Sequence, residues 1–329
     1  MPLVVHFLNV GRGDCTIIQF PLPSGRIGIV DIDALKSFDP DTEAELVQAY
    51  IESAGYLATK AFLPGTELAL TKEFIRRKEA ELTNPIQYFD SHIGPANAVF
   101  RLIITHPDMD HMTGIADLYH GKTLLNLWHI GPHDYNLGET TDQEWAKSPY
   151  AKDDWETYKA LRYSSNSPKS LVMRQGHTGD YWTEDGIELW APTAELVDLS
   201  VERNQANIAS MLLKVSYKGR VVVLGGDATA DETWAKVYPH IDMKGVDVLK
   251  ASHHGRKTGY YWPAVKEMQP WLTITSVGEK AYDATENYRR YSAYTVSLRD
   301  SGNIRITIDD DGTLFYPSEI EEHWKPKKD

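Results

Sequence analysis

Short apolar runs separated by turn residues recur along the chain and predict a protein built largely from β-strands. The runs are rich in β-branched residues, and glycine, proline or serine interrupts them. The predicted strands lie at 4–8, 15–20, 26–30, 99–104, 124–130, 211–217, 220–224, 246–249 and 271–277. A closing hairpin is predicted at 303–316, where residues 309–312 join two strands. The segment 180–192 is predicted to be another hairpin, turning at Asp185 and Gly186.

Residues 34–97 break the strand pattern with apolar residues at helical spacing. They predict one helix over 42–55 and a second over 68–82. Such a length is far more than a strand-to-strand connection needs. We therefore expect a helical insertion within a single domain that covers residues 1–329. The insertion either caps a pocket or packs at the periphery, and residues 131–170 are expected to form helix and loop on the surface.

Polar residues follow the predicted strands at four separated places. These are Asp31, His106, Asp227 and the pair His253 and His254. In layered α/β folds, ligands collect at the carboxyl ends of strands, so one sheet scaffold could gather all four places at one edge. Neighbouring residues in an extended loop point opposite ways, so we expect only one of the paired histidines to be a direct ligand.

The segment THPDMDHMTG, just after the predicted strand at 99–104, packs the densest group of candidate ligands. His106, Asp108 and Asp110 alternate, so they face one way in an extended segment, and a turn brings His111 round to them. Buried without a cation, these groups would be costly. Mixed imidazole and carboxylate ligands favour divalent metal ions, and the spacing allows two. The alternative is a surface loop with solvated histidines.

Composition sets the broad class of the protein. The 329 residues are 42% hydrophobic and 25% charged, which is typical of a globular chain. Cys15 is the single cysteine, so no disulfide within the chain is possible, and we expect a reducing, cytoplasmic location. The first residues lack a secretory signal, and no apolar run approaches the roughly 18 residues of a membrane span, so no membrane association is expected.

The net charge of −13 argues against a protein that coats nucleic acid by charge alone. Bound cations would reverse the local field of a pocket rich in carboxylates, so a phosphodiester substrate stays compatible with this acidity. The roles of two further acidic residues remain open. Asp31 is expected to accept a hydrogen bond from a metal-binding histidine or to line the rim. For Asp14, a turn-capping role and a site role are equally open. The pattern indicates no particular protein partner.

Several motifs, in order, resemble the metallo-β-lactamase superfamily, and within it the ComEC-type domain of DNA-uptake proteins in free-standing form. HPDMDH resembles the HxHxDH loop with Asp in the second His position, and LNVGRGDCTII resembles the DVGQGDA opening of that branch. LKASHHGRKTG resembles LKxPHHGS, and GIVDID supplies the superfamily aspartate. The segment at 207–228 resembles NxxSLVL…GD, which matches Asn207, Ser210 and Asp227.

This resemblance covers most of 4–36 and 98–312, and it implies an α+β, four-layer αββα sandwich with a dinuclear site for Zn or Mn. One ion would be held by His106 and Asp108, the other by Asp110 and His111, with Asp227 bridging and His254 or His253 completing the set. The third histidine of the lactamase pattern is missing, and Asn207 or His177 could stand in for it. Aspartate in place of histidine replaces a nitrogen ligand with a harder oxygen ligand, so Mn is as credible as Zn.

The resemblance implies hydrolysis of a phosphodiester bond in DNA, RNA or a small nucleotide, as in a nuclease or phosphodiesterase. Asp110 or Asp108 would orient the attacking water, which two metal ions make reactive. Lys250, His253 or Arg256 would neutralise a phosphoryl oxygen. Basic residues near the pocket would favour phosphate. An apolar lid would favour the alternative of a non-phosphate ester, lactone or amide. A second alternative is a non-catalytic metal- or partner-binding module.

Overall fold

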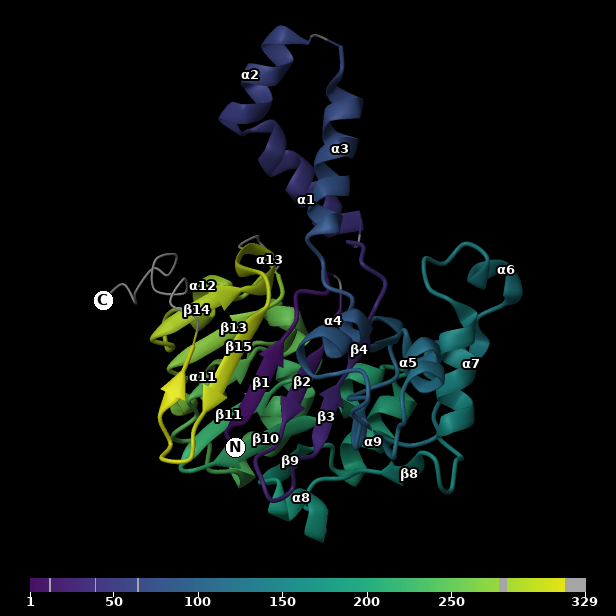
Figure 1. Ribbon diagram of the computed structural model, residues 1–329, viewed down its shortest axis with the longest axis vertical. Coiled ribbons are helices and arrows are strands. Elements are labelled where there is room, and N and C mark those ends of the chain that lie inside the picture. Colours follow the sequence, from purple (N-terminus) through teal and green to yellow (C-terminus); the bar gives the residue numbers. More distant parts are fainter. Residues whose placement is uncertain (12, 39, 64, 278–282, 317–329) are drawn as a thin grey trace.

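Two β-sheets form the centre of the molecule and carry helices on their outer faces (Figure 1). The computed structural model describes residues 1–316 except 12, 39, 64 and 278–282. The expected domain range and helical insertion both include some residues outside this description.

The first sheet has the strand order β16-β15-β1-β2-β3-β5-β7-β8. Strands from β16 to β3 pair antiparallel, and those from β3 to β8 pair parallel. Its strands are β1 (Leu3–Phe7), β2 (Thr16–Gln19), β3 (Ile27–Val30), β5 (Arg101–Ile103), β7 (Asn126–His129), β8 (Lys169–Val172), β15 (Ile304–Ile308) and β16 (Leu314–Phe315). The antiparallel pair of β15 and β16 confirms the predicted closing hairpin.

The second sheet has the order β14-β13-β12-β11-β10-β9. Strands β11 to β14 pair parallel, whereas β9 and β10 join antiparallel. Its strands are β9 (Ile187–Ala191), β10 (Leu212–Tyr217), β11 (Arg220–Leu224), β12 (Val248–Lys250), β13 (Leu272–Thr275) and β14 (Tyr294–Ser297). A short parallel pair, β4 (Ile32–Asp33) and β6 (Met112–Thr113), lies beside the histidine-rich loop.

Alternation along the strands produces the layers. Ile103 and Val222 point into the core between the two sheets. Their chain neighbours Leu102 and Val223 point outward, each into a separate core beneath the helices of its own side. Because successive strand residues face opposite ways, a run that is apolar on both faces must be covered twice. This confirms the predicted four-layer αββα sandwich.

The helices divide between the two outer faces. Helices α4 (Pro85–His92), α5 (Ile115–Gly121) and α7 (Lys152–Leu161) supply buried residues to the core outside the first sheet. Helices α9 (Ala194–Glu202), α10 (Ala235–Val237), α11 (Trp262–Met268) and α12 (Thr285–Tyr288) do so for the second. The short helix α6 (Asp142–Trp145) adds Trp145 to the core outside the first sheet, and α13 (Leu298–Ser301) adds Leu298 to the core between the sheets. Within the described part of the chain, no helix is both long enough and apolar enough to cross a membrane.

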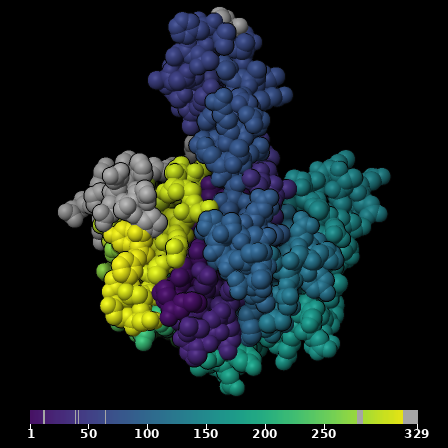
Figure 2. Space-filling view, viewed as in Figure 1, coloured from purple at the N-terminus to yellow at the C-terminus, as the bar shows by residue number. Residues whose placement is uncertain are grey.

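An arm of three helices projects from the sandwich (Figures 1 and 2). It consists of α1 (Pro40–Ile51), α2 (Ala54–Phe62) and α3 (Glu67–Ala80). The sequence predicted a single helix over 42–55, but the chain breaks there. The Ser53 hydroxyl accepts a hydrogen bond from the Tyr56 N–H at 3.2 Å and starts a new helix.

The predicted hairpin at 180–192 is wrong. Residues Asp180–Glu184 form helix α8, and only the following strand β9 joins a sheet. The physical reason is charge burial. The Asp185 carboxylate lies 2.6 Å from Arg101 and 3.1 Å from Arg26, so it is drawn inward instead of forming an exposed turn.

Candidate metal centre

The loop after β5 turns two histidines toward each other. His106 and His111 are both fully buried, and their ring centroids lie 4.2 Å apart. A 3₁₀ turn at Met109–His111 reverses the chain between them. The extended conformation expected from the sequence therefore ends at this turn, which brings the second imidazole to the first.

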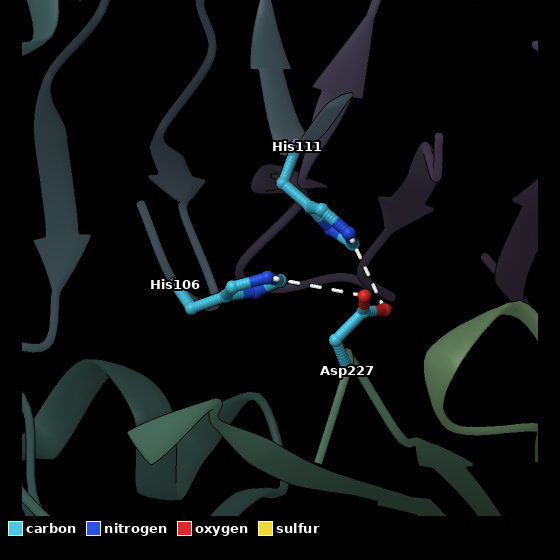
Figure 3. A group of neighbouring side chains, drawn as sticks. All are labelled: His106, His111 and Asp227. Carbon is cyan, nitrogen blue, oxygen red and sulfur yellow. Dashed lines mark ion pairs between the residues drawn. The ribbon is translucent and has the colours of Figure 1, made fainter. Parts of the chain in front are cut away.

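Asp227 faces both rings from the other sheet (Figure 3). Its Oδ1 lies 3.3 Å from Nε2 of His111, and its Oδ2 lies 3.9 Å from Nε2 of His106. The chain reaches this position through Gly226, which has a φ of +45° and leaves no room for a side chain beside the Ser210 hydroxyl. That hydroxyl accepts the Asp227 N–H at 2.9 Å and fixes the loop. The local sequence thus holds the carboxylate against the imidazoles.

The paired histidines after β12 both lie near Asp227. Nε2 of His254 lies 3.4 Å from the Asp227 carboxylate and 3.5 Å from that of Asp110, whereas Nε2 of His253 lies 3.7 Å from Asp227. Both residues have positive φ, so they form a turn instead of the extended loop expected from the sequence. His254 is buried, but the His253 side chain is 26% exposed and contacts Thr258.

The candidate ligands form three overlapping groups, and within each group three ligand atoms lie within 4.8 Å of one another. They are His106, His111 and Asp227; Asp110, His111 and His254; and Asp14, Asp227 and His254. Nε2 of His106, Nε2 of His111 and Oδ1 of Asp227 are buried and have no hydrogen-bond partner among the described residues. Buried polar atoms are rarely left unpaired, so converging lone pairs of this kind fit a cation. The cluster is consistent with a dinuclear metal site.

Asp31 determines which nitrogen of His111 is available. Its Oδ2 lies 2.9 Å from Nδ1 of His111, and the Thr105 N–H and hydroxyl both donate to the same carboxylate at 2.8 Å. A histidine that donates through one nitrogen presents the lone pair of the other. Nε2 therefore faces the cluster and can bind only one ion, whereas Asp227 has two oxygens and could contact two. The contact between the Asp31 carboxylate and a histidine is the one predicted from the sequence. That this histidine binds a metal stays a prediction.

Other predicted site residues lie at different distances from the cluster. Asp108 is 3.4 Å from Nε2 of His106, but its side chain is 41% exposed and belongs to none of the three groups. Nδ2 of Asn207 donates to Asp227 at 3.3 Å, whereas His177 is exposed. Asn207 is thus the one of the two proposed stand-ins that contacts a candidate ligand.

Asp14, for which the sequence left a turn role and a site role open, is buried beside the cluster. Its Oδ1 accepts hydrogen bonds from the Lys250 amine at 2.7 Å and the Ser276 hydroxyl at 2.8 Å, and it lies 3.4 Å from His254. Burial alone would raise the pKa of Asp14, but Lys250 and His254 outweigh it and hold that pKa below its usual value. The Lys250 amine is buried and donates to Asp14. Its contact with a phosphoryl oxygen of a substrate stays a prediction.

Metal affinity is expected to fall as the pH is lowered. Burial tends to lower the pKa of His111 and His254, but Asp227 and its neighbouring carboxylates raise each well above 6.5 in the protein without metal. An ion must displace those protons, so affinity should rise about tenfold per pH unit for each proton displaced. Calorimetric titration of Mn²⁺ between pH 6 and 8 measures this. A dissociation constant that does not change over that range would contradict it.

Gly13 packs directly against the site loop, which makes it a sensitive position. A Cβ there would lie 1.8 Å from the Asp110 carbonyl oxygen. We expect Gly13→Ala to displace that loop, weaken Mn²⁺ binding and lower the free energy of unfolding by about 1–3 kcal/mol. Gly121→Ala is the matched control, because no atom lies within 4 Å of the added Cβ. Urea unfolding and metal titration of both variants test this, and equal behaviour would contradict it.

The chain is similar to proteins of larger size. No family model matches it. Recombination protein 2 of Haemophilus influenzae is 24% identical over 216 residues, which are 63% of this chain and 22% of that protein. A mutant of the CmlA beta-hydroxylase has a TM-score of 0.47 at 12% identity, covering 92% of this chain and 53% of that chain. A crystal structure of CmlA, a diiron beta-hydroxylase from Streptomyces venezuelae, has a TM-score of 0.40 at 12% identity, covering 83% and 44%.

The chain thus spans less than a quarter of Recombination protein 2 and about half of CmlA. The alignment with Recombination protein 2 agrees with the resemblance that the motifs imply. The two facing sheets carry those motifs at strand ends, where the histidines and aspartates converge. The chain thus has the two-sheet αββα architecture that its resemblance to the metallo-β-lactamase superfamily implied, and part of its sequence is similar to part of Recombination protein 2.

Proposed function

We propose that the protein is a metal-dependent hydrolase of phosphodiester bonds. The observation that carries this proposal is a cavity of about 690 Å³ beside His253, whose Nε2 lies 3.7 Å from Asp227. Its described lining includes Arg256, Lys257, Asp283 and the ion pair of Arg299 with Glu45. The Arg256 and Lys257 side chains suit a phosphate better than a neutral ester or lactone, because guanidinium and ammonium groups pair with phosphoryl oxygens. The relative's name, Recombination protein 2, agrees with a nucleic acid as one form of this substrate.

The chain's own residues would hold two divalent ions, Zn or Mn, around Asp227. Such ions supply a more acidic water and stabilise negative charge on the attacked and leaving oxygens. His106, His111 and His254 offer imidazole nitrogens, and Asp31 keeps the His111 proton on Nδ1. The Asp110 side chain is 23% exposed at the edge of the cluster, so its carboxylate can orient a water for attack.

A substrate panel tests the proposal. Wild type and Asp110→Asn are assayed with Mn²⁺ or Zn²⁺ on single-stranded and duplex DNA, RNA, cyclic nucleotides, a chromogenic phosphodiester and a lactone. We expect cleavage of at least one phosphodiester and a loss of about 10²-fold or more in the variant. Cleavage of the lactone alone would favour the ester, lactone or amide hydrolase. Failure to bind any stoichiometric divalent ion would favour the non-catalytic binding module.

Equal rates in wild type and Asp110→Asn would contradict the catalytic role given to Asp110, but they would leave the assignment of the fold unchanged. Asp117→Asn is the matched control, because its carboxylate is exposed on α5 and belongs to none of the ligand groups. Its activity is expected to equal that of wild type.

A further inference from the structure

Two cavities border the metal cluster, and they share no lining residue. The first, of about 690 Å³, is lined by His253, whose Nε2 lies 3.7 Å from the Asp227 carboxylate of the cluster. The second, of about 630 Å³, reaches it at Asp108 and Asp110. Both volumes fall in the range of about 300–1,000 Å³ that is usual for small-molecule sites. A substrate held at the cluster can therefore extend into two separate spaces.

The first cavity is basic, and the helical arm supplies one of its walls. The Arg299 guanidinium at the start of α13 lies 3.0 Å from Glu45 and 3.1 Å from the Thr42 hydroxyl, so it connects α1 to the sandwich. Glu45 and Arg299 offset each other. Among the lining residues that the structure describes, Arg256 and Lys257 then outnumber the one further acidic residue, Asp283. The space beside His253 thus favours an anionic group.

The second cavity has the opposite character. Four of its lining residues are acidic, and in the described part of the chain none of its lining residues is lysine or arginine. The acidic residues are Asp108, Asp110, Glu139 and Glu144, and the aromatic ones are Trp145 and Tyr150. Ions at the cluster would offset Asp110, but Glu139 belongs to none of the ligand groups. An aromatic wall of this charge suits an uncharged ring and repels a phosphate.

We propose that the substrate is a short phosphodiester that lies across the cluster in one polarity. On one side of the scissile bond it carries a further, terminal phosphate, which enters the basic cavity. On the other side it carries an uncharged nucleoside, which lies against the acidic, aromatic cavity. This inference rests on the proposed function and narrows it, because the interior of a long nucleic acid has phosphates on both sides. Arg256 and Lys257 select the terminal phosphate, and Glu139 rejects one on the opposite side.

Three dinucleotides test this polarity with the Mn²⁺-loaded protein. They are thymidylyl-thymidine and its 5′-phosphorylated and 3′-phosphorylated forms. We expect one phosphorylated form to be cleaved with a kcat/KM about tenfold above the unphosphorylated one, as a charge-assisted contact provides. The other form should show no gain or a loss. Equal gains from both terminal phosphates, or from neither, would overturn the proposal.

Variants of exposed lining residues locate the effect. Lys257→Gln should reduce the preference for the favoured form about tenfold, measured as the ratio of its kcat/KM to that of the unphosphorylated dinucleotide. Lys266→Gln is the matched control, because Lys266 is exposed on α11 and lines neither cavity. Glu139→Gln should raise the kcat/KM of the disfavoured form. An unchanged ratio in Lys257→Gln would contradict the assignment of the basic cavity.

Failure of the proposed function gives a different result. If no dinucleotide is cleaved, the same three are titrated calorimetrically into the Mn²⁺-loaded protein. Tighter binding of one phosphorylated form, lost in Lys257→Gln, would then support the subsite while rejecting hydrolysis. Cleavage without any preference among the three would support hydrolysis while rejecting the subsite.

Discussion

Replacing Asp227 with asparagine is expected to abolish stoichiometric binding of divalent ions and to reduce any hydrolytic activity by at least about 10³-fold. The carboxylate lies within 4 Å of nitrogens on His106, His111 and His254. An amide keeps the shape of the side chain but replaces one acceptor oxygen with a donor and removes the negative charge. The loss should therefore exceed the about 10- to 100-fold typical of residues that only support a ligand.

Calorimetry and elemental analysis of purified Asp227→Asn measure this effect, with circular dichroism to show that the variant is folded. Asp117→Asn again provides the matched change from carboxylate to amide outside the cluster. A folded Asp227→Asn that binds ions as tightly as wild type would show that this carboxylate does not hold metal.

Lys250→Met is expected to have the largest effect on stability, about 3–5 kcal/mol in the free energy of unfolding. The Lys250 amine is 2.7 Å from the Asp14 carboxylate, and both residues are buried. Methionine fills a similar volume but leaves the Asp14 charge without its main partner. Removing one member of a buried pair costs much more than removing both, because the remaining charge is not compensated.

The double variant Asp14→Asn, Lys250→Met should therefore recover part of the loss. Urea unfolding of wild type, both single variants and the double variant, each without added metal, gives the coupling energy between the two residues. A loss below about 1 kcal/mol in Lys250→Met, or additive losses in the double variant, would show that the two buried charges do not depend on each other.

The layered architecture could be predicted because strand signals in this chain are local. The runs at 220–224 and 246–249 are rich in valine and leucine, and the structure places β11 and β12 there. Val222 and Val248 face the core between the sheets, and Val223 and Leu249 face the outer core. Motifs that end such strands identified Asp227 and the histidine loop, and the structure brings them together. Sequence reasoning succeeds where neighbouring residues alone determine the outcome.

Long-range contacts explain what the sequence did not reveal. Asp14 resembles an ordinary turn aspartate until Lys250, far away in the chain, pairs with it inside the fold. Asp185 was assigned to a hairpin turn, but contacts with Arg101 and Arg26 bury it. The turn that brings His253 and His254 to one carboxylate depends on positive φ values, which the residue types did not indicate.

Anomalous diffraction from crystals grown with Mn²⁺ would test most directly whether the cluster is a metal centre. We predict two anomalous peaks, both within ligand distance of Asp227. One should contact His106 and His111, and the other Asp110 and His254. Absence of any peak near Asp227 in a well-ordered crystal, or peaks confined to surface carboxylates, would contradict a metal centre at this position.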